Sequence, residues 1–132
     1  MKKKTKRLIA TILVTLLLAT LCSAFLQAYA WTNISSATAG LSISGNTGYA
    51  ACTLSTFNGV TKVTVKCNLQ QKIGSSWVTI ASWEKNVDGR SCDVGGNKVL
   101  TKGYEYRVEG IFTAKSSTLT ETATLYSVVK TY

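Results

Sequence analysis

Apolar and polar residues alternate along most of the chain beyond residue 30, and a period of two is typical of β-strands with one buried face. In KVTVKCNLQ, the residues Val63, Val65, Cys67 and Leu69 share one face. No segment of this region keeps the 3.6-residue apolar period of a helix for three turns. Glycine, asparagine and serine turn signals separate the alternating runs. The pattern predicts strands near residues 40–45, 48–56, 61–72, 76–85, 97–101, 104–114 and 119–130.

Six to seven short strands within about one hundred residues predict an all-β, antiparallel sandwich or barrel. In GYEYRVEGIF, one face carries the large apolar side chains from Tyr104 to Phe112. The other face carries Glu105, Arg107 and Glu109. We expect the apolar set to be buried, because that removes the larger apolar area from water. The two glutamates would stand roughly 13 Å apart on an extended strand, which is too far for a hydrolytic carboxylate pair.

The first thirty residues have the composition of a secretory leader. A basic run, MKKKTKR, precedes an apolar run and the small-x-small tripeptide Ala28-Tyr29-Ala30. We therefore expect a signal peptide at residues 1–30 and a secreted, extracellular domain at residues 31–132. A weaker cleavage site follows Ala24. The alternative is an uncleaved anchor, because residues 8–26 are barely long enough to span a bilayer. Contact with a membrane is otherwise expected only through the leader before cleavage.

The charge of the chain says little about its partners. The whole sequence carries +9, but the residues beyond 30 hold ten basic and six acidic side chains, a net of +4. The lysines are dispersed from Lys62 to Lys130, whereas a nucleic-acid surface needs a basic cluster. Dispersed lysines on a strand-rich protein discourage edge-to-edge pairing. No nucleic-acid partner is expected.

Few residues of the chain are suited to catalysis or metal binding. The chain has no histidine, which excludes Ser-His-Asp and Cys-His arrangements and most zinc sites. Oxygen ligands for calcium crowd the segment NVDGRSCDVGGN at residues 86–97, namely Asn86, Asp88, Asp93 and Asn97. Their spacing is not that of an EF-hand, and such residues with glycine are typical of turns. We expect a loop here, no metal or other cofactor, and no enzymatic activity.

Two tryptophans suggest a binding surface. Trp77 and Trp83 have the same parity in the strand predicted at residues 76–85, so both would lie on one face. If that face is exposed, flat rings could stack on a sugar. Burial is the competing interpretation, because large aromatic residues dominate the cores of small domains.

Three cysteines, Cys52, Cys67 and Cys92, follow the leader, and an odd count leaves one of them unpaired in an oxidising compartment. If residues 58–61 connect a hairpin, Cys52 stands opposite Cys67 on the apolar face. Directly opposed residues of a non-hydrogen-bonded pair come close enough for a disulfide. A shift of one residue in the turn breaks this pairing, and three reduced cysteines remain the alternative. Cys92, in the polar loop, would be a free thiol.

The run Leu100-x-x-Gly103-x-x-Tyr106-x-Val108 in LTKGYEYRVEG resembles the segment leading into the sixth strand of fibronectin type III and immunoglobulin-like sandwiches. This resemblance implies a single antiparallel sandwich of six to seven strands in which Tyr106 forms a tyrosine corner. The strand of Tyr106 has no cysteine, so the core disulfide of antibody domains is not expected. LQQKIGSSWVTIASW, GYEYRV and ETATLYS together resemble an uncharacterised group of small secreted proteins from Gram-positive bacteria, which implies no particular activity.

These features favour a secreted, non-enzymatic module that binds an extracellular protein or glycan. The alternative is a small secreted toxin or bacteriocin-like effector that acts on neighbouring cells.

Overall fold

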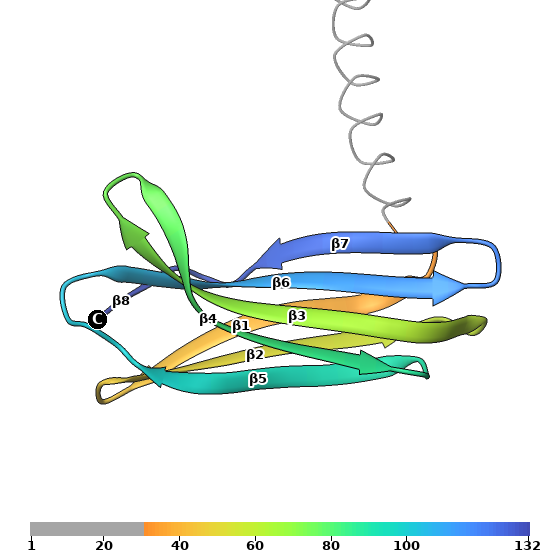
Figure 1. Ribbon diagram of the computed structural model, residues 1–132, viewed down its shortest axis with the longest axis horizontal. Coiled ribbons are helices and arrows are strands. Elements are labelled where there is room, and N and C mark those ends of the chain that lie inside the picture. Colours follow the sequence, from red (N-terminus) through yellow and green to blue (C-terminus); the bar gives the residue numbers. More distant parts are fainter. Residues whose placement is uncertain (1–30) are drawn as a thin grey trace, which may run out of the picture. The chain divides into compact units, whose positions relative to one another are not determined.

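Two antiparallel sheets face each other in the part of the chain that the computed structural model describes, residues 31–132 (Figure 1). The smaller sheet has the order β1-β2-β5, and the larger has the order β4-β3-β6-β7 with β8 paired to β6. The strands are β1 (Ile34–Ser44), β2 (Thr47–Thr56), β3 (Val60–Ile73), β4 (Ser76–Val87), β5 (Ser91–Val99), β6 (Glu105–Ser116), β7 (Thr120–Tyr126) and β8 (Lys130–Thr131). The prediction of an all-β antiparallel sandwich is confirmed, with eight strands rather than six or seven. The expected signal peptide and its cleavage sites lie outside the described residues. Among residues 31–132, no helix has the length and hydropathy needed to cross a membrane.

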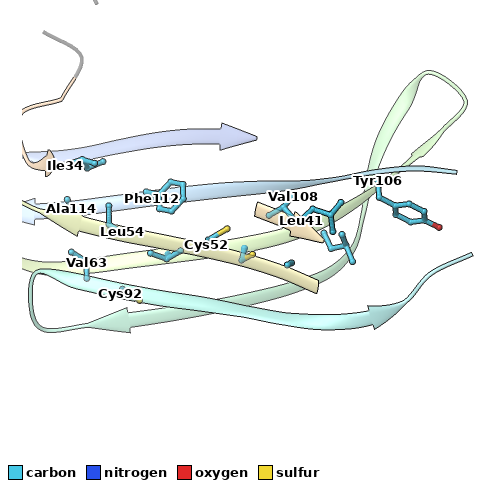
Figure 2. Packing of buried hydrophobic residues seen from close by; sticks show 14 of the residues in the cluster. Ile34, Leu41, Cys52, Leu54, Val63, Cys92, Tyr106, Val108, Phe112 and Ala114 are labelled. Carbon is cyan, nitrogen blue, oxygen red and sulfur yellow. The ribbon is translucent and has the colours of Figure 1, made fainter. Parts of the chain in front are cut away.

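Alternation along the two central strands of the larger sheet builds the core. In β3, the apolar face predicted from the sequence is at most 1 % exposed, and in β6 the side chains of Tyr106, Val108 and Phe112 are fully buried. Burying each of these large side chains contributes about 1.5–3 kcal/mol. Figure 2 shows the labelled core residues along the space between the sheets, from Ile34 at one end to Tyr106 at the other. Tyr104 departs from the prediction: it precedes β6 and is 39 % exposed.

Three of the connections carry the chain from one sheet to the other. The chain crosses between the sheets from β2 to β3, from β4 to β5 and from β5 to β6, whereas β3–β4 and β6–β7 are hairpins within the larger sheet. The predicted hairpin through residues 58–61 is therefore wrong. β2 already has β1 on one side and β5 on the other, and the residues after it carry the chain to the opposite sheet.

The segment expected to be a loop at residues 86–97 is mostly strand. β4 continues to Val87 and β5 begins at Ser91, with only a bend at residues 88–90 between them. The Gly95-Gly96 pair lies inside β5 because neighbouring atoms occupy the space that side chains would need. A Cβ on Gly95 would overlap the carbonyl oxygen of Ala50, and a Cβ on Gly96 would overlap the ring of Trp83. Glycine within a strand here marks close approach rather than a turn.

β1 begins six residues earlier than predicted because its start is anchored to β7. The Glu121 carboxylate accepts hydrogen bonds from the backbone N–H groups of Thr32, Asn33 and Ile34 at 2.6, 3.1 and 2.9 Å. Ile34 is 1 % exposed and belongs to the core. A serine- and threonine-rich segment with weak alternation is thus ordered by contacts with a strand some ninety residues later in the chain.

Candidate binding face

A β-bulge separates the two tryptophans of β4. The register between β3 and β4 shifts after Leu69, and Ile80 is the extra residue without a partner. An extra residue reverses the direction of the side chains beyond it. Trp83 pairs with Cys67 and turns toward the core, whereas Trp77 pairs with Lys72 and turns to the outer face of the larger sheet. The prediction that Trp77 and Trp83 share a face is wrong.

Trp83 is not a surface-binding aromatic residue. It packs against the core, and its ring occupies the space above Gly96 of β5, in the opposite sheet. The indole thus closes one side of the sandwich, where β4 and β5 lie at the edges of their sheets. Its function is packing, and only Trp77 remains as a candidate for binding.

On the outer face of the larger sheet, the guanidinium of Arg107 contacts two aromatic rings. Its central carbon is 4.3 Å from the ring centroid of Trp77 and 4.1 Å from that of Tyr126. Both distances are well within the range of cation–π contacts. We call Trp77, Arg107 and Tyr126 the arginine stack. Its members come from β4, β6 and β7, three different strands of one sheet, and half of Tyr126 remains exposed.

A hydrogen bond fixes the orientation of the guanidinium in the stack. The Nε–H of Arg107 donates to Oε1 of Gln70 at 2.8 Å, and Gln70 is only 7 % exposed. Lys72 and Glu105 form the one ion pair among the described residues, at 3.4 Å. No carboxylate of residues 31–132 therefore neutralises Arg107. Its terminal N–H groups remain as donors on the outer face.

Polar side chains extend this face along the sheet. Asn68 donates to Oε1 of Glu109 at 3.0 Å, and its own Oδ1 accepts from the hydroxyl of Ser82 at 2.6 Å. The three residues lie on β3, β6 and β4, so the network crosses the same strands as the stack. Every buried polar side-chain atom of the described residues has a partner. The polar groups of this face thus bind one another.

Tyr106 has a structural position at one end of the sandwich. Its ring is fully buried, its hydroxyl donates to the carbonyl oxygen of Thr101 at 2.6 Å, and the backbone N–H of Thr101 donates to the hydroxyl at 3.0 Å. A buried tyrosine that bonds the backbone a few residues upstream is the geometry of a tyrosine corner. It fixes the crossing from β5 to β6.

The three cysteines are buried free thiols. Cys52 lies in the smaller sheet and Cys67 in the larger, and both side chains enter the core between the sheets. The neighbouring Cys67 raises the pKa of Cys52, with burial adding to the rise, whereas the neighbouring Cys52 lowers the pKa of Cys67. Cys92 is not in a polar loop as predicted. It lies in β5, where its Sγ–H donates to the carbonyl oxygen of Lys85 at 3.9 Å and burial raises its pKa.

The candidate calcium ligands do not lie in one loop. Asn86 is in β4, Asp88 is at the bend, and Asp93 and Asn97 are in β5. Within residues 31–132, no group of three or more cysteine, aspartate or glutamate side chains is placed to hold a metal ion.

No family model matches the chain, and a comparison with curated proteins finds none of similar sequence. The candidate site therefore rests on geometry. The described residues enclose no pocket, so the arginine stack is presented on an open sheet face. Sequence reasoning missed Arg107 and Tyr126 as partners of Trp77. Alternation placed Arg107 on the outer face, but only the strand order brings the three side chains together.

Proposed function

We propose that the chain is a secreted, non-enzymatic binding module that contacts an extracellular glycan through the arginine stack. The leader sequence supports secretion, and the observation that supports binding is the contact of the Arg107 guanidinium with the rings of Trp77 and Tyr126. The resemblance to small secreted proteins of Gram-positive bacteria is consistent with this proposal.

The stack is suited to binding because it is ordered in advance. An exposed arginine normally loses rotamer entropy when a ligand immobilises it. Here two rings contact the guanidinium and Gln70 holds Nε, so little further freedom is lost. The terminal N–H groups can donate to sugar hydroxyl, carboxylate or phosphate oxygens.

The neighbouring groups fit a sugar polymer. The exposed half of the Tyr126 ring can stack on an apolar sugar face, as amphipathic aromatic rings do at binding surfaces. The carboxylate of Glu109 lies on β6, the strand that also carries Arg107, and can accept hydrogen bonds from sugar hydroxyl groups. An open sheet face suits a chain that lies along it.

The test is retention on insoluble peptidoglycan and on immobilised mucin and polysaccharides. The chain offers a matched pair of variants, because Arg107→Gln and Arg90→Gln each remove one positive charge. Arg90 is exposed at the bend between β4 and β5, where it contacts Asn58. Loss of a charge-assisted hydrogen bond of about 1.5–3 kcal/mol predicts roughly 10- to 150-fold weaker binding for Arg107→Gln. Arg90→Gln should bind as the wild type does.

Equal retention of the two variants would overturn the proposed site. Growth inhibition of indicator bacteria without retention on any polymer would favour the toxin alternative instead.

A further inference from the structure

Cys52 and Cys67 occupy the centre of the sandwich from opposite sides. Both side chains are fully buried, Cys52 on the middle strand of the smaller sheet and Cys67 on a central strand of the larger one. The two thiols are close enough for each to shift the pKa of the other. Facing cysteines are in a different situation from the structural cysteines of most interiors, which lie among apolar groups.

Gly110 of β6 marks the place where the two cysteines approach each other, because it is the register partner of Cys67. A Cβ on Gly110 would overlap the ring of Phe112 at 2.6 Å and would stand 3.2 Å from the Sγ of Cys52. The sulfur of Cys52 therefore reaches across the sandwich to the backbone beside Cys67, into space that any side chain at position 110 would contest.

We propose that Cys52 and Cys67 are oxidised to an intramolecular disulfide that links the two sheets. This bond differs in position from the hairpin bridge that the sequence suggested, because it runs through the core between sheets rather than between neighbouring strands of one sheet. It also differs from the core bridge of antibody domains, since the strand of Tyr106 contributes Gly110 instead of a cysteine. The proposal does not depend on the glycan-binding function.

The reaction needs an external oxidant, which we take to be a disulfide carried by a thiol oxidoreductase or by oxidised glutathione. One cysteine thiolate attacks the carrier disulfide and releases one carrier thiol. The second cysteine thiolate then attacks the mixed disulfide and releases the other carrier sulfur. Two S–H bonds are lost and one S–S bond forms, while the carrier gains two electrons and two protons. Because both sulfur atoms are buried, this exchange takes place before the sheets close.

Cys92 stays a thiol in this scheme. Its register partner in β2 is Leu54 rather than Cys52, and its Sγ–H is directed to the carbonyl oxygen of Lys85. The third cysteine therefore serves as an internal control for accidental oxidation.

Peptide mapping tests the proposal on protein produced through a bacterial secretory pathway and alkylated without reduction. Trypsin separates the three cysteines, because Cys67 falls in the peptide 67–72, Cys92 in the peptide 91–98 and Cys52 in the peptide that ends at Lys62. We expect the Cys52 and Cys67 peptides to be joined, and the peptide 91–98 to be alkylated once the protein is denatured. An alkylated peptide 67–72, or a link to Cys92, would overturn the proposal.

Thermal unfolding gives a second readout. A bridge that closes a loop of about fifteen residues should make the reduced protein melt more than about 10 °C below the oxidised protein. Cys92→Ala should keep this redox-dependent difference, and Cys52→Ala should abolish it. If Cys52→Ala fails to fold, the wild-type peptide map still decides. A midpoint unaffected by reductant would contradict the bond.

Discussion

Removal of the Arg107 side chain should destabilise the sandwich by about 2–5 kcal/mol, a large cost for a residue on an outer face. Two ring contacts, with Trp77 and Tyr126, contribute about 0.5–1 kcal/mol each. Arg107→Ala also leaves Oε1 of the nearly buried Gln70 without its donor, and an unsatisfied buried acceptor costs about 1–3 kcal/mol. Arg107→Lys should lie between wild type and Arg107→Ala, because a lysine keeps the charge but lacks the planar fork.

Urea denaturation measures this loss of stability, provided that the slope of the free energy of unfolding against urea concentration (the m-value) is the same for all variants. Arg90→Ala is the matched control and should change stability by less than about 0.5 kcal/mol, as most exposed substitutions do. A double-mutant cycle of Trp77→Ala and Arg107→Ala should give a coupling of about 0.5–1 kcal/mol. If Arg107→Ala costs no more than Arg90→Ala, the stack does not hold the guanidinium and the reasoning about preorganisation is refuted.

Three further predictions concern the fold. Tyr106→Phe should cost about 1–2 kcal/mol in thermal unfolding, because both hydrogen bonds to Thr101 are lost; an unchanged midpoint would show that the corner contributes nothing. Gly95→Ala should cost at least about 2 kcal/mol, since its Cβ would overlap the carbonyl oxygen of Ala50, and wild-type stability would refute that close approach. Burial raises the pKa of Cys92 above its ordinary 9.0. The contribution of the Cys92 thiol to the free energy of unfolding is therefore complete below pH 9. It is lost as the pH rises further, because the thiol of the unfolded chain ionises first. Cys92→Ala should make this alkaline loss of stability shallower in urea titrations of the reduced protein.

The sequence predicted the buried face of those strands whose own alternation of apolar and polar residues determines it. Alternation in β3 and β6 correctly identified the face that packs into the core, because both strands are central and one face of each is the core. The prediction failed in β4 and β5, where contacts with other strands determine the local structure. The bulge at Ile80 depends on the pairing of β3 with β4. Gly95 and Gly96 have the composition of a turn, and only the packing of Ala50 and Trp83 against them explains their place in a strand.

The candidate binding face could be predicted only in part for the same reason. Trp77 was a candidate from its residue type, and Arg107 was placed on an outer face by parity. Tyr126 carried no signal of its own, because its contact with Arg107 follows from the adjacency of β6 and β7. The contact between Cys52 and Cys67 was anticipated through a hairpin that does not form. Their contact arises instead from the crossing of the chain between sheets, which no local pattern encodes.

A nuclear magnetic resonance titration would locate the ligand on the protein. The protein, labelled with nitrogen-15, is mixed with soluble fragments of the polymer that retains it. We expect the largest shifts at the Nε–H of Arg107, the indole N–H of Trp77 and the amides of β6 and β7. The smaller sheet, β1, β2 and β5, should remain unchanged. Shifts concentrated on the smaller sheet, with the signals of Arg107 and Trp77 unmoved, would contradict the assignment of the arginine stack as the binding face.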